Sequence, residues 1–459
     1  MSLGRGELVR RVLHVGCGGF APLLRWLTWP QAAGLAILAF LFNWQVLPRV
    51  GGRSLWRGGD RSRGYAAGIL LYPLTVLGLI LLFRDRPWIA AAGWGLLAVG
   101  DGMAGLVGQL AGGPRLPWNP RKGWWGLLAF VAFGTPAAAG LWAWVAHLPL
   151  APDALHWPRT VGIAFVAAVA CALVESVPTT LDDNLTVPLA AALVLPLAAG
   201  ADPQLLLGDP SLPTRVAVGL LLNGAIALAS LRARAIDVPG ALSAIVIGTA
   251  ITAALGLGGL WLMVAFFVLG SVTTRLGYRA KAARGIAQER GGARGWPHAW
   301  ANGGVPAVLA VLAGMAPPPF RDLLVLAYAG AVATAAADTC SSEVGKAFGR
   351  RTFLVTTLRP VPPGTDGAVS LEGTLSGLGG ALVVAGLGAV VGLYGRPAVA
   401  LVGVAGFLGS LAESVLGTVA ERRGWMGNEL LNAVNTAIGA LLVVLLVKAR
   451  GWASPLLSP

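Results

Sequence analysis

The chain has 459 residues, of which 56% are hydrophobic and only 12% are charged, and its mean hydropathy is +0.72. These values exclude an ordinary soluble domain and predict an all-α, polytopic integral membrane protein. The net charge of +14 would suggest a nucleic-acid partner for a soluble protein. Here the basic residues lie in short loops between apolar runs, so membrane orientation explains most of them and no nucleic-acid partner is expected.

Apolar runs predict about fourteen membrane-spanning helices, several of them shorter than the ~20 residues of a full span. The segment 13–29 fits a half-buried entry helix as well. The predicted spans lie near 31–47, 65–83, 88–111, 124–147, 160–177, 185–200, 216–231, 241–255, 258–274, 305–316, 322–338, 374–393, 397–419 and 430–448.

Every second loop falls on the same face of the membrane, and together these loops carry most of the arginines and lysines. The positive-inside rule makes that face cytoplasmic. We therefore expect an integral protein of a bacterial-type inner membrane, with its polar motifs facing the cytoplasm. The loops on this face are 48–64, 113–123, 178–184, 232–240, 275–304, 339–373 and 420–429.

Several familiar ligand-binding signatures fail in this sequence. Cys17, Cys171 and Cys340 lack metal-ligand spacing and are expected to be small buried residues. GDGMAG, at 100–105, satisfies G-x-G-x-x-G, but it lies in a membrane run that no strand precedes, so a dinucleotide site is not expected. The sequence also contains no G-x-x-x-x-G-K-[ST] loop.

A weak internal repeat indicates two related membrane modules, 1–205 and 215–459. GDGMAGLVGQLAG, at 100–112, aligns with ADTCSSEVGKAFG, at 337–349, and the alignment pairs Asp101 with Asp338. A basic, proline-bearing loop follows each segment. Further on, Glu175-Ser176 corresponds to Glu413-Ser414, since the two glutamates lie 74 and 75 residues after Asp101 and Asp338. The glycines between them align only with an insertion of roughly ten residues.

The segment 337–373 concentrates polar chemistry in the second module. Asp338, Glu343 and Lys346 stand where the span 322–338 is expected to end, and ionisable side chains within a membrane mark ion or substrate sites. Thr356, Thr357, Arg359, the run PPGTDG and Ser370 follow. Cations, hydroxyls and exposed glycine amides suit an oligophosphate, and the carboxylates suit Mg²⁺.

In the first module, Asp101, Glu175, Asp182 and Asp183 lie at the cytoplasmic edge of apolar helices, together with Arg121, Lys122 and Asn184. His14 shares a helical face with Glu7 and Arg11, which gives it a possible phosphate-binding or gating role. For each acid alone, a solvated helix end is the alternative. Trp118, Trp124 and Trp125 fit an aromatic belt, and Arg279, Lys281 and Arg284 fit either orientation charge or a phosphate clamp.

The motifs ELVRRVLH, DGMAGLVG, PWNPRKGWWG, ALVESVP and DDNLTVP resemble the phytol kinase and dolichol kinase family over roughly residues 5–200. This resemblance implies CTP-dependent phosphorylation of an isoprenoid alcohol. The order of motifs is also similar to CDP-diacylglycerol synthases, which transfer a cytidylyl group, although DDNLTVP favours the kinases. Gly123 departs from the pattern, because the kinase family more often has serine there.

The second module resembles the family of plant phytyl-phosphate kinase and transmembrane protein 19, also called domain of unknown function 92. The resemblance covers about 215–450 and rests on ADTCSSEVG, TTLRPVPPGTDGAVSLEG, GSLAESVLG and NELLNAVNT. It implies a second phosphorylation, from prenyl monophosphate to diphosphate. Glu413 departs from the aspartate expected at its position.

Together these patterns predict a bifunctional kinase that converts a long-chain prenol, of the phytol or geranylgeraniol type, into its monophosphate and then its diphosphate. The expected partners are the bilayer, the isoprenoid alcohol and its monophosphate, a nucleoside triphosphate such as CTP, and Mg²⁺. The alternatives are a cytidylyltransferase that makes a CDP-lipid and a secondary transporter, which the repeats and the high glycine content would also suit.

The candidate residues fall into three groups. The expected catalytic residues are Asp101, Lys122, Glu175, Asp338, Lys346 and Arg359. The expected Mg²⁺ ligands are Asp101, Glu175, Asp182, Asp183, Asp338, Glu343 and Glu413. The expected substrate and nucleotide contacts are His14, Arg121, Asn184, Asn302, Thr356, Thr357, Gly364, Thr365, Asp366, Gly367, Ser370, Asn428 and Asn432.

Overall fold

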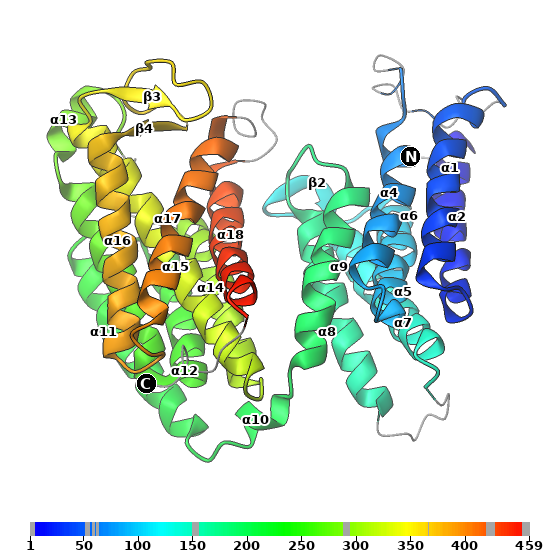
Figure 1. The fold of residues 1–459 in the computed structure, drawn as a ribbon, viewed down its shortest axis with the longest axis horizontal. Coiled ribbons are helices and arrows are strands. Elements are labelled where there is room, and N and C mark those ends of the chain that lie inside the picture. Colours follow the sequence, from blue (N-terminus) through cyan, green and yellow to red (C-terminus); the bar gives the residue numbers. More distant parts are fainter. Residues whose placement is uncertain are drawn as a thin grey trace. The chain divides into compact units, whose positions relative to one another are not determined.

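The protein is helical and divides into two compact units, Met1–Gly200 and Ala201–Pro459, called unit 1 and unit 2 below (Figure 1). The computed structural model describes residues 5–50, 56, 60, 64–148, 156–287, 294–365, 367–418 and 427–451. Within these ranges the strands form two small antiparallel sheets, β1–β2 in unit 1 and β3–β4 in unit 2.

Unit 1 contains α1 (Arg5–Cys17), η1 (Gly18–Arg25), α2 (Trp29–Leu41), η2 (Phe42–Val46), α4 (Ala67–Leu82), α5 (Pro87–Gly95), η4 (Leu96–Asp101), α6 (Gly102–Ala111), β1 (Arg115–Leu116), β2 (Asn119–Gly123), α7 (Trp124–Val145), α8 (His156–Ser176) and α9 (Asp183–Gly200). Unit 2 contains α10 (Pro203–Leu207), α11 (Leu212–Arg232), α12 (Val238–Arg275), α13 (Tyr278–Ala283), α14 (Trp296–Gly314), α15 (Phe320–Phe348), β3 (Thr352–Leu354), β4 (Ala368–Ser370), α16 (Leu371–Val390), α17 (Ala398–Leu416) and α18 (Asn428–Ala449).

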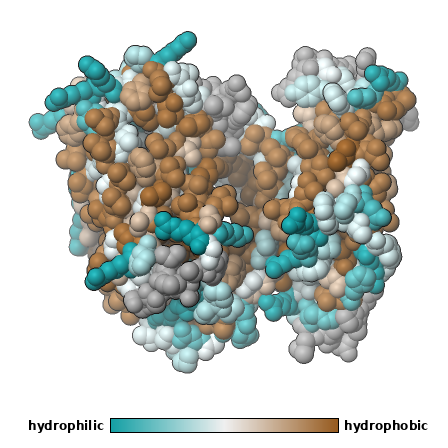
Figure 2. All heavy atoms as spheres, in the orientation of Figure 1, coloured by the Kyte–Doolittle hydropathy of each residue, from teal (hydrophilic) through white to brown (hydrophobic). Residues whose placement is uncertain are grey.

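The fold is that of an all-α, polytopic membrane protein, as predicted. Ten helices in the described ranges are long and apolar enough to cross a membrane. On the visible face of each unit, hydrophobic side chains cover the outer sides of the helices and hydrophilic ones gather towards their ends (Figure 2). The expected number of about fourteen spans stays a prediction. Helix α4 has only 16 residues, fewer than the ~20 of a full span. The runs 241–255 and 258–274, which were predicted as two spans, both belong to α12, which bends at Gly256.

Two loop boundaries were wrong. The span that was expected to end near residue 338 continues as α15 to Phe348, so Asp338 lies inside a helix. Hydropathy misplaced this end because the last turns of α15 are polar. The predicted loop 275–304 contains α13 and the start of α14, which begins at Trp296 with proline in its first turn.

The two units share one sequence of elements around their aspartates. In unit 1, the continuous helix formed by α5, η4 and α6 carries Asp101 and is followed by the β1–β2 hairpin, α7, α8 and α9. In unit 2, α15 carries Asp338 and is followed by the β3–β4 hairpin, α16, α17 and α18. Glu175 lies in the last turn of α8, and Glu413 lies in the last turn of α17.

Corresponding glycines bring corresponding helices together in both units. A Cβ on Gly108 would lie 3.2 Å from the Cα of Gly126 in α7, and a Cβ on Gly373 in α16 would lie 3.2 Å from the Cα of Gly345. Gly108 and Gly345 are also paired in the sequence repeat. The helix after each hairpin therefore crosses the aspartate-bearing helix at backbone contact distance, which small residues permit.

Helix α15 is the centre of unit 2. The most apolar 18-residue stretch of α15 is 94% buried, whereas the corresponding stretches of the other nine candidate spans are 22–67% buried. The segment 327–337 consists of small residues apart from Tyr328 and Val332, so neighbouring helices approach closely. Gly409 of α17 and Gly439 of α18 both pack against the buried Thr334 side chain.

Replacement of Gly439 by alanine is expected to destabilise unit 2. The new Cβ would lie 1.9 Å from Oγ1 of Thr334 and 2.9 Å from the carbonyl oxygen of Gly330. Overpacking of this kind costs about 1–3 kcal/mol. Reversible unfolding in detergent should report that loss for Gly439→Ala. Gly386→Ala is the matched control, since nothing lies within 4 Å of its Cβ position; equal stability of both variants would contradict the tight packing.

Candidate functional site

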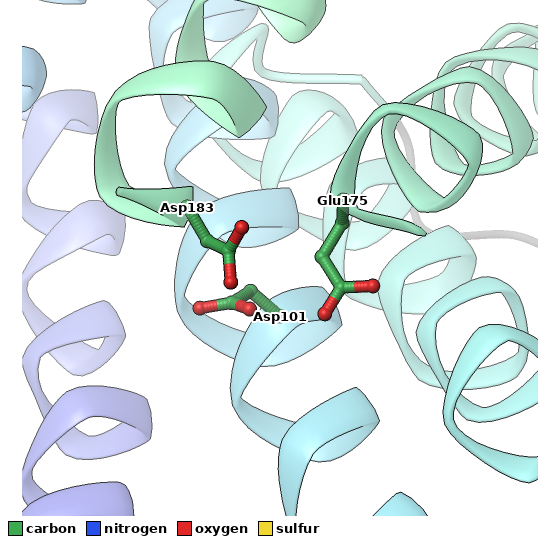
Figure 3. A group of neighbouring side chains, drawn as sticks. All are labelled: Asp101, Glu175 and Asp183. Carbon is green, nitrogen blue, oxygen red and sulfur yellow. The ribbon is translucent and has the colours of Figure 1, made fainter. Parts of the chain in front are cut away.

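Three carboxylates that are far apart in the sequence meet in unit 1 (Figure 3). Asp101 ends η4, Glu175 lies near the end of α8, and Asp183 is the first residue of α9. One oxygen from each lies within 4.8 Å of the other two. Carboxylate oxygens are the ligands that Mg²⁺ prefers, and this set would suit the ion once the three oxygens close around it.

A π-helical turn positions Asp101. Such turns insert an extra residue into a helix and are frequent at functional sites. Nε2 of His14 donates a hydrogen bond to the carbonyl oxygen of Leu97 within the turn, at 2.9 Å, and lies 3.3 Å from Oδ2 of Asp101. Burial lowers the pKa of His14 below its ordinary value of 6.5, so the ring is neutral at pH 7 and carries its proton on Nε2. His14 thus positions Asp101.

The β1–β2 hairpin places Lys122 beside the carboxylates. The buried side chain of Asn119 donates to the carbonyl oxygen of Ser176 at 2.9 Å, and Nε1 of Trp118 donates to the Ser176 hydroxyl at 3.0 Å. These bonds fix the hairpin against the end of α8. Nζ of Lys122 consequently pairs with Glu175 and lies 3.2 Å from Oδ2 of Asp183.

The other predicted residues of unit 1 lie around this cluster with different contacts. Asp182 caps α9, because its carboxylate accepts from the amide of Asn184 at 3.0 Å, and it does not join the three-carboxylate group. The side-chain amide of Asn184 donates to the carbonyl oxygen of Gly68 at 3.2 Å, while its Oδ1 is buried without a partner. The Arg121 side chain is exposed.

In unit 2, Asp338 and Glu413 meet inside the helix bundle. The two carboxyl groups are in hydrogen-bonding contact, and the charge of Lys346 acts on Asp338. Two carboxyl groups in contact must share a proton or hold a cation between them. Two of the three predicted acids of this module, Asp338 from α15 and Glu413 from α17, are therefore brought together.

Asn435 of α18 belongs to the same layer of unit 2. Its side chain is 1% exposed, and its buried Oδ1 has no hydrogen-bond partner among the residues that the structure describes. Gly439, one turn later, packs on Thr334, which lies one turn before Asp338. Because α18 runs antiparallel to α15, Asn435 reaches the level of Asp338. Asn428 and Asn432 are the contacts predicted from the sequence, although the buried positions 431, 435 and 439 follow helical spacing.

Glu343 makes an ion pair away from the Asp338 contact. Nζ of Lys281 binds Oε2 of Glu343 at 2.5 Å and the carbonyl oxygens of Thr274 at 2.8 Å and Thr273 at 3.3 Å. Lys281 is 0% exposed, so the structure buries a residue that was expected to be an orientation charge or part of a phosphate clamp. Glu343 lies five residues after Asp338 and points to another side of α15, so the structure does not add it to the predicted metal site.

The loop between β3 and β4 has mainly structural contacts. Thr356, Thr357 and Arg359 are exposed, and no contact places Arg359 near Asp338 among the described residues. Gly364 and Gly367 have positive φ angles of 90° and 72°, and Gly367 packs on the end of α17, next to Ser414. Thr365 donates to the carbonyl oxygen of Pro362, and the buried Ser370 hydroxyl caps α16. Asp366 lies outside the described residues.

Three predicted asparagine contacts have ordinary positions in helices of unit 2. Asn302 lies within α14 and donates to the carbonyl oxygen of His298 at 3.1 Å. Asn428 is the exposed first residue of α18, and Asn432 is half-buried on the next turn. None of them reaches Asp338 through a contact within the described residues.

Comparison with known proteins places the chain in a family. The sequence profile of the family described as "Integral membrane protein DUF92" matches residues 221–440. "Uncharacterized membrane protein sll0875" of Synechocystis sp. is 42% identical over 200 residues, which are 43% of this chain and 78% of that protein. The chain belongs to the DUF92 family of integral membrane proteins.

Two further relatives confirm the resemblance drawn from the sequence motifs. "Protein VTE6, chloroplastic" of Arabidopsis thaliana is 34% identical over 212 residues, 45% of this chain and 64% of that protein. "Phytol kinase" of Synechocystis sp. is 34% identical over 141 residues, 28% of this chain and 57% of that protein. The chain thus covers less than two thirds of each of these two relatives. No solved structure matches it.

The Lys122 ion pairs should stabilise the fold up to strongly alkaline pH. Burial lowers the pKa of Lys122, but the charges of Glu175 and Asp183 outweigh burial and raise the pKa above 10.5. A pKa raised by folding gives full stabilisation below the unfolded pKa and loses it as pH rises through the folded pKa. Lys122→Met should therefore cost about 1–2 kcal/mol of unfolding free energy at pH 7–9, and less above about pH 10.5.

Denaturant unfolding of the parent and Lys122→Met in detergent, repeated across pH, measures this difference. Lys448→Met is the control, because Lys448 is exposed in the last turn of α18. A difference that already disappears at pH 8 would contradict the assigned ion pairs.

Proposed function

We propose that the chain is a bifunctional isoprenoid-alcohol kinase. Unit 1 would transfer a phosphoryl group from a nucleoside triphosphate, CTP by the family resemblance, to a long-chain prenol. Unit 2 would convert the monophosphate to the diphosphate. The observation that carries this proposal is the meeting of Asp101, Glu175 and Asp183 with the Lys122 ammonium group in a membrane protein related to phytol kinases.

The charges in unit 1 suit a magnesium–nucleotide complex. Asp101, Glu175 and Asp183 are the residues that would hold Mg²⁺, which neutralises phosphate charge in phosphoryl transfer. With all three acids ionised, Lys122 balances one of them, and the remaining two negative charges match a divalent cation. His14 holds Asp101 in place. The ammonium of Lys122 also offers a positive charge for the transferring group.

The transfer itself follows from the chemistry of the substrates. The prenol oxygen forms a bond to the γ-phosphorus as the bond between that phosphorus and the β-phosphate oxygen breaks. The nucleoside diphosphate leaves, and a carboxylate of the cluster takes the hydroxyl proton. The acceptor's hydrocarbon chain remains in the bilayer, with its hydroxyl at the membrane surface.

The charges of the two units support the order of the two reactions. At the first position of α9 unit 1 has Asp183, whereas α18 of unit 2 begins with Asn428. Around α15, Lys281 is already paired with Glu343, and Lys346 and Arg294 are the further cations of unit 2. The replacement of an acid by an asparagine suits an acceptor that already carries a phosphate. Unit 2 therefore fits the monophosphate, and unit 1 fits the neutral alcohol.

Purified protein with labelled CTP, Mg²⁺ and geranylgeraniol or phytol should form the monophosphate and then the diphosphate. Asp101→Asn should reduce monophosphate formation at least about 100-fold and spare phosphorylation of added monophosphate. Asp338→Asn should do the reverse. Matched controls are Asp85→Asn, at an exposed position, and Asp322→Asn, in the first turn of α15.

Other outcomes would identify the rival functions. Release of pyrophosphate with a cytidylyl-lipid product would show cytidylyl transfer, and prenol-independent flux in proteoliposomes would show transport. The absence of both phosphorylated products with several prenols and nucleotides would reject the kinase proposal.

Binding of Mn²⁺ tests the metal assignment separately from the kinase activity. Mn²⁺, which takes the same oxygen ligands as Mg²⁺, should bind the protein and give a measurable paramagnetic signal. Glu175→Gln should weaken this binding in unit 1 at least about tenfold, because it removes one of the three charged ligands. Glu372→Gln, in the first turn of α16, is the control. Equal Mn²⁺ binding by both variants would contradict the site.

A further inference from the structure

Unit 2 contains an apolar cavity whose lining does not include Asp338 or Glu413. It has a volume of about 110 Å³ and lies among α11, α12 and α14. Ala244, Ile247, Met263, Phe266 and Gly303 are among its lining residues. Asn223, Arg294 and His298 supply the polar side chains of its wall.

The cavity follows the helices over a length that suits a hydrocarbon chain. Its lining on the first arm of α12 extends from Gly240 to Gly248, about 12 Å at the helical rise of 1.5 Å per residue. On α14 it extends from Gly295, the N-cap, to Gly303, a similar length. Arg294 immediately precedes that N-cap, so the cation lies at one end of this apolar length.

Arg294 is held there without a neutralising partner. Its backbone amide donates to the carbonyl oxygen of Ala235 at 3.0 Å, which fixes the main chain. Its guanidinium lies 5.8 Å from the ring centre of Phe266 and packs on Gly270, where a Cβ would be 2.7 Å from Nη2. Among the described residues, the guanidinium makes no hydrogen bond or ion pair. A half-buried cation of this kind is stabilised when an anionic group binds it.

We propose that this cavity binds the first isoprene units in the tail of a prenyl monophosphate, with the phosphate at Arg294. The inference rests on the proposed function and names the binding site for the substrate of its second step. Charge selects the occupant, because a neutral prenol would leave Arg294 unpaired. Glu343 and Cys340 of α15 are the titratable groups that act on Arg294. The phosphate would therefore lie beside the helix that carries Asp338.

Filling the cavity tests the tail site. Direct binding of geranylgeranyl monophosphate to the full chain in detergent would be measured by equilibrium binding. Ala244→Phe should weaken this binding at least about tenfold and leave isopentenyl monophosphate unaffected, because the short chain does not need the cavity. Leu242→Phe is the matched control, since Leu242 is 62% exposed on the same helix. Equal affinities of the two phenylalanine variants would overturn the tail site.

Removing the cation tests the phosphate site. Arg294→Gln should weaken the binding of both monophosphates at least about thirtyfold. The affinity for geranylgeranyl monophosphate should then be close to the affinity for geranylgeraniol. Arg294→Lys should restore part of the affinity. If Arg294→Gln does not fold, the Ala244→Phe series still decides the proposal. Lysophosphatidic acid that binds as tightly as geranylgeranyl monophosphate would overturn the assignment to an isoprenoid tail.

Binding and turnover separate this inference from the kinase proposal. Cavity-dependent binding of the monophosphate without turnover in the parent protein would reject the kinase and keep the binding site. Diphosphate formation with an unchanged KM in Ala244→Phe would reject the tail site and keep the kinase.

Discussion

The close crossing of two helices is the constraint on which each candidate site depends. In unit 1 α7 crosses α6 at Gly108 and Gly126, and in unit 2 α16 crosses α15 at Gly345 and Gly373. In each unit the hairpin between the crossing helices has to turn within a short distance, which keeps it beside the aspartate-bearing helix. In unit 1 this arrangement gives Lys122 its position. Larger side chains at the crossing would separate the helices and the groups they carry.

The same scaffold presents different charges in the two units. Lys122 extends from the β1–β2 hairpin, but the corresponding residue before α16 is Val369, and unit 2 obtains cations from α13, α15 and the residue that precedes α14. The two units thus keep a pair of acids in equivalent places while the charges around each pair differ. The acids Glu175 and Glu413 retain equivalent places in the last turns of α8 and α17.

The sequence predicted what depends on local pattern and repetition. The membrane class followed from hydropathy, and the repeat pointed to Asp101 with Glu175 and to Asp338 with Glu413. The sequence could not reveal contacts between distant polar residues. Lys281 lies among arginines, as a charged residue in a solvent-exposed loop would, yet its side chain is buried against Glu343. Asn435 was missed because it stands in a mostly apolar helix. The end of α15 was misplaced because buried polar turns resemble a solvated helix end.

The buried pair of Lys281 and Glu343 has a consequence for biogenesis. The two residues are 62 positions apart, so the ribosome makes the lysine well before its counter-ion exists. Until α15 emerges, the ammonium group has to stay at the aqueous surface, since lipid would not accept it alone. Final docking of α13 therefore waits for later synthesis, and nascent unit 2 passes through a stage in which this short helix is still outside the bundle.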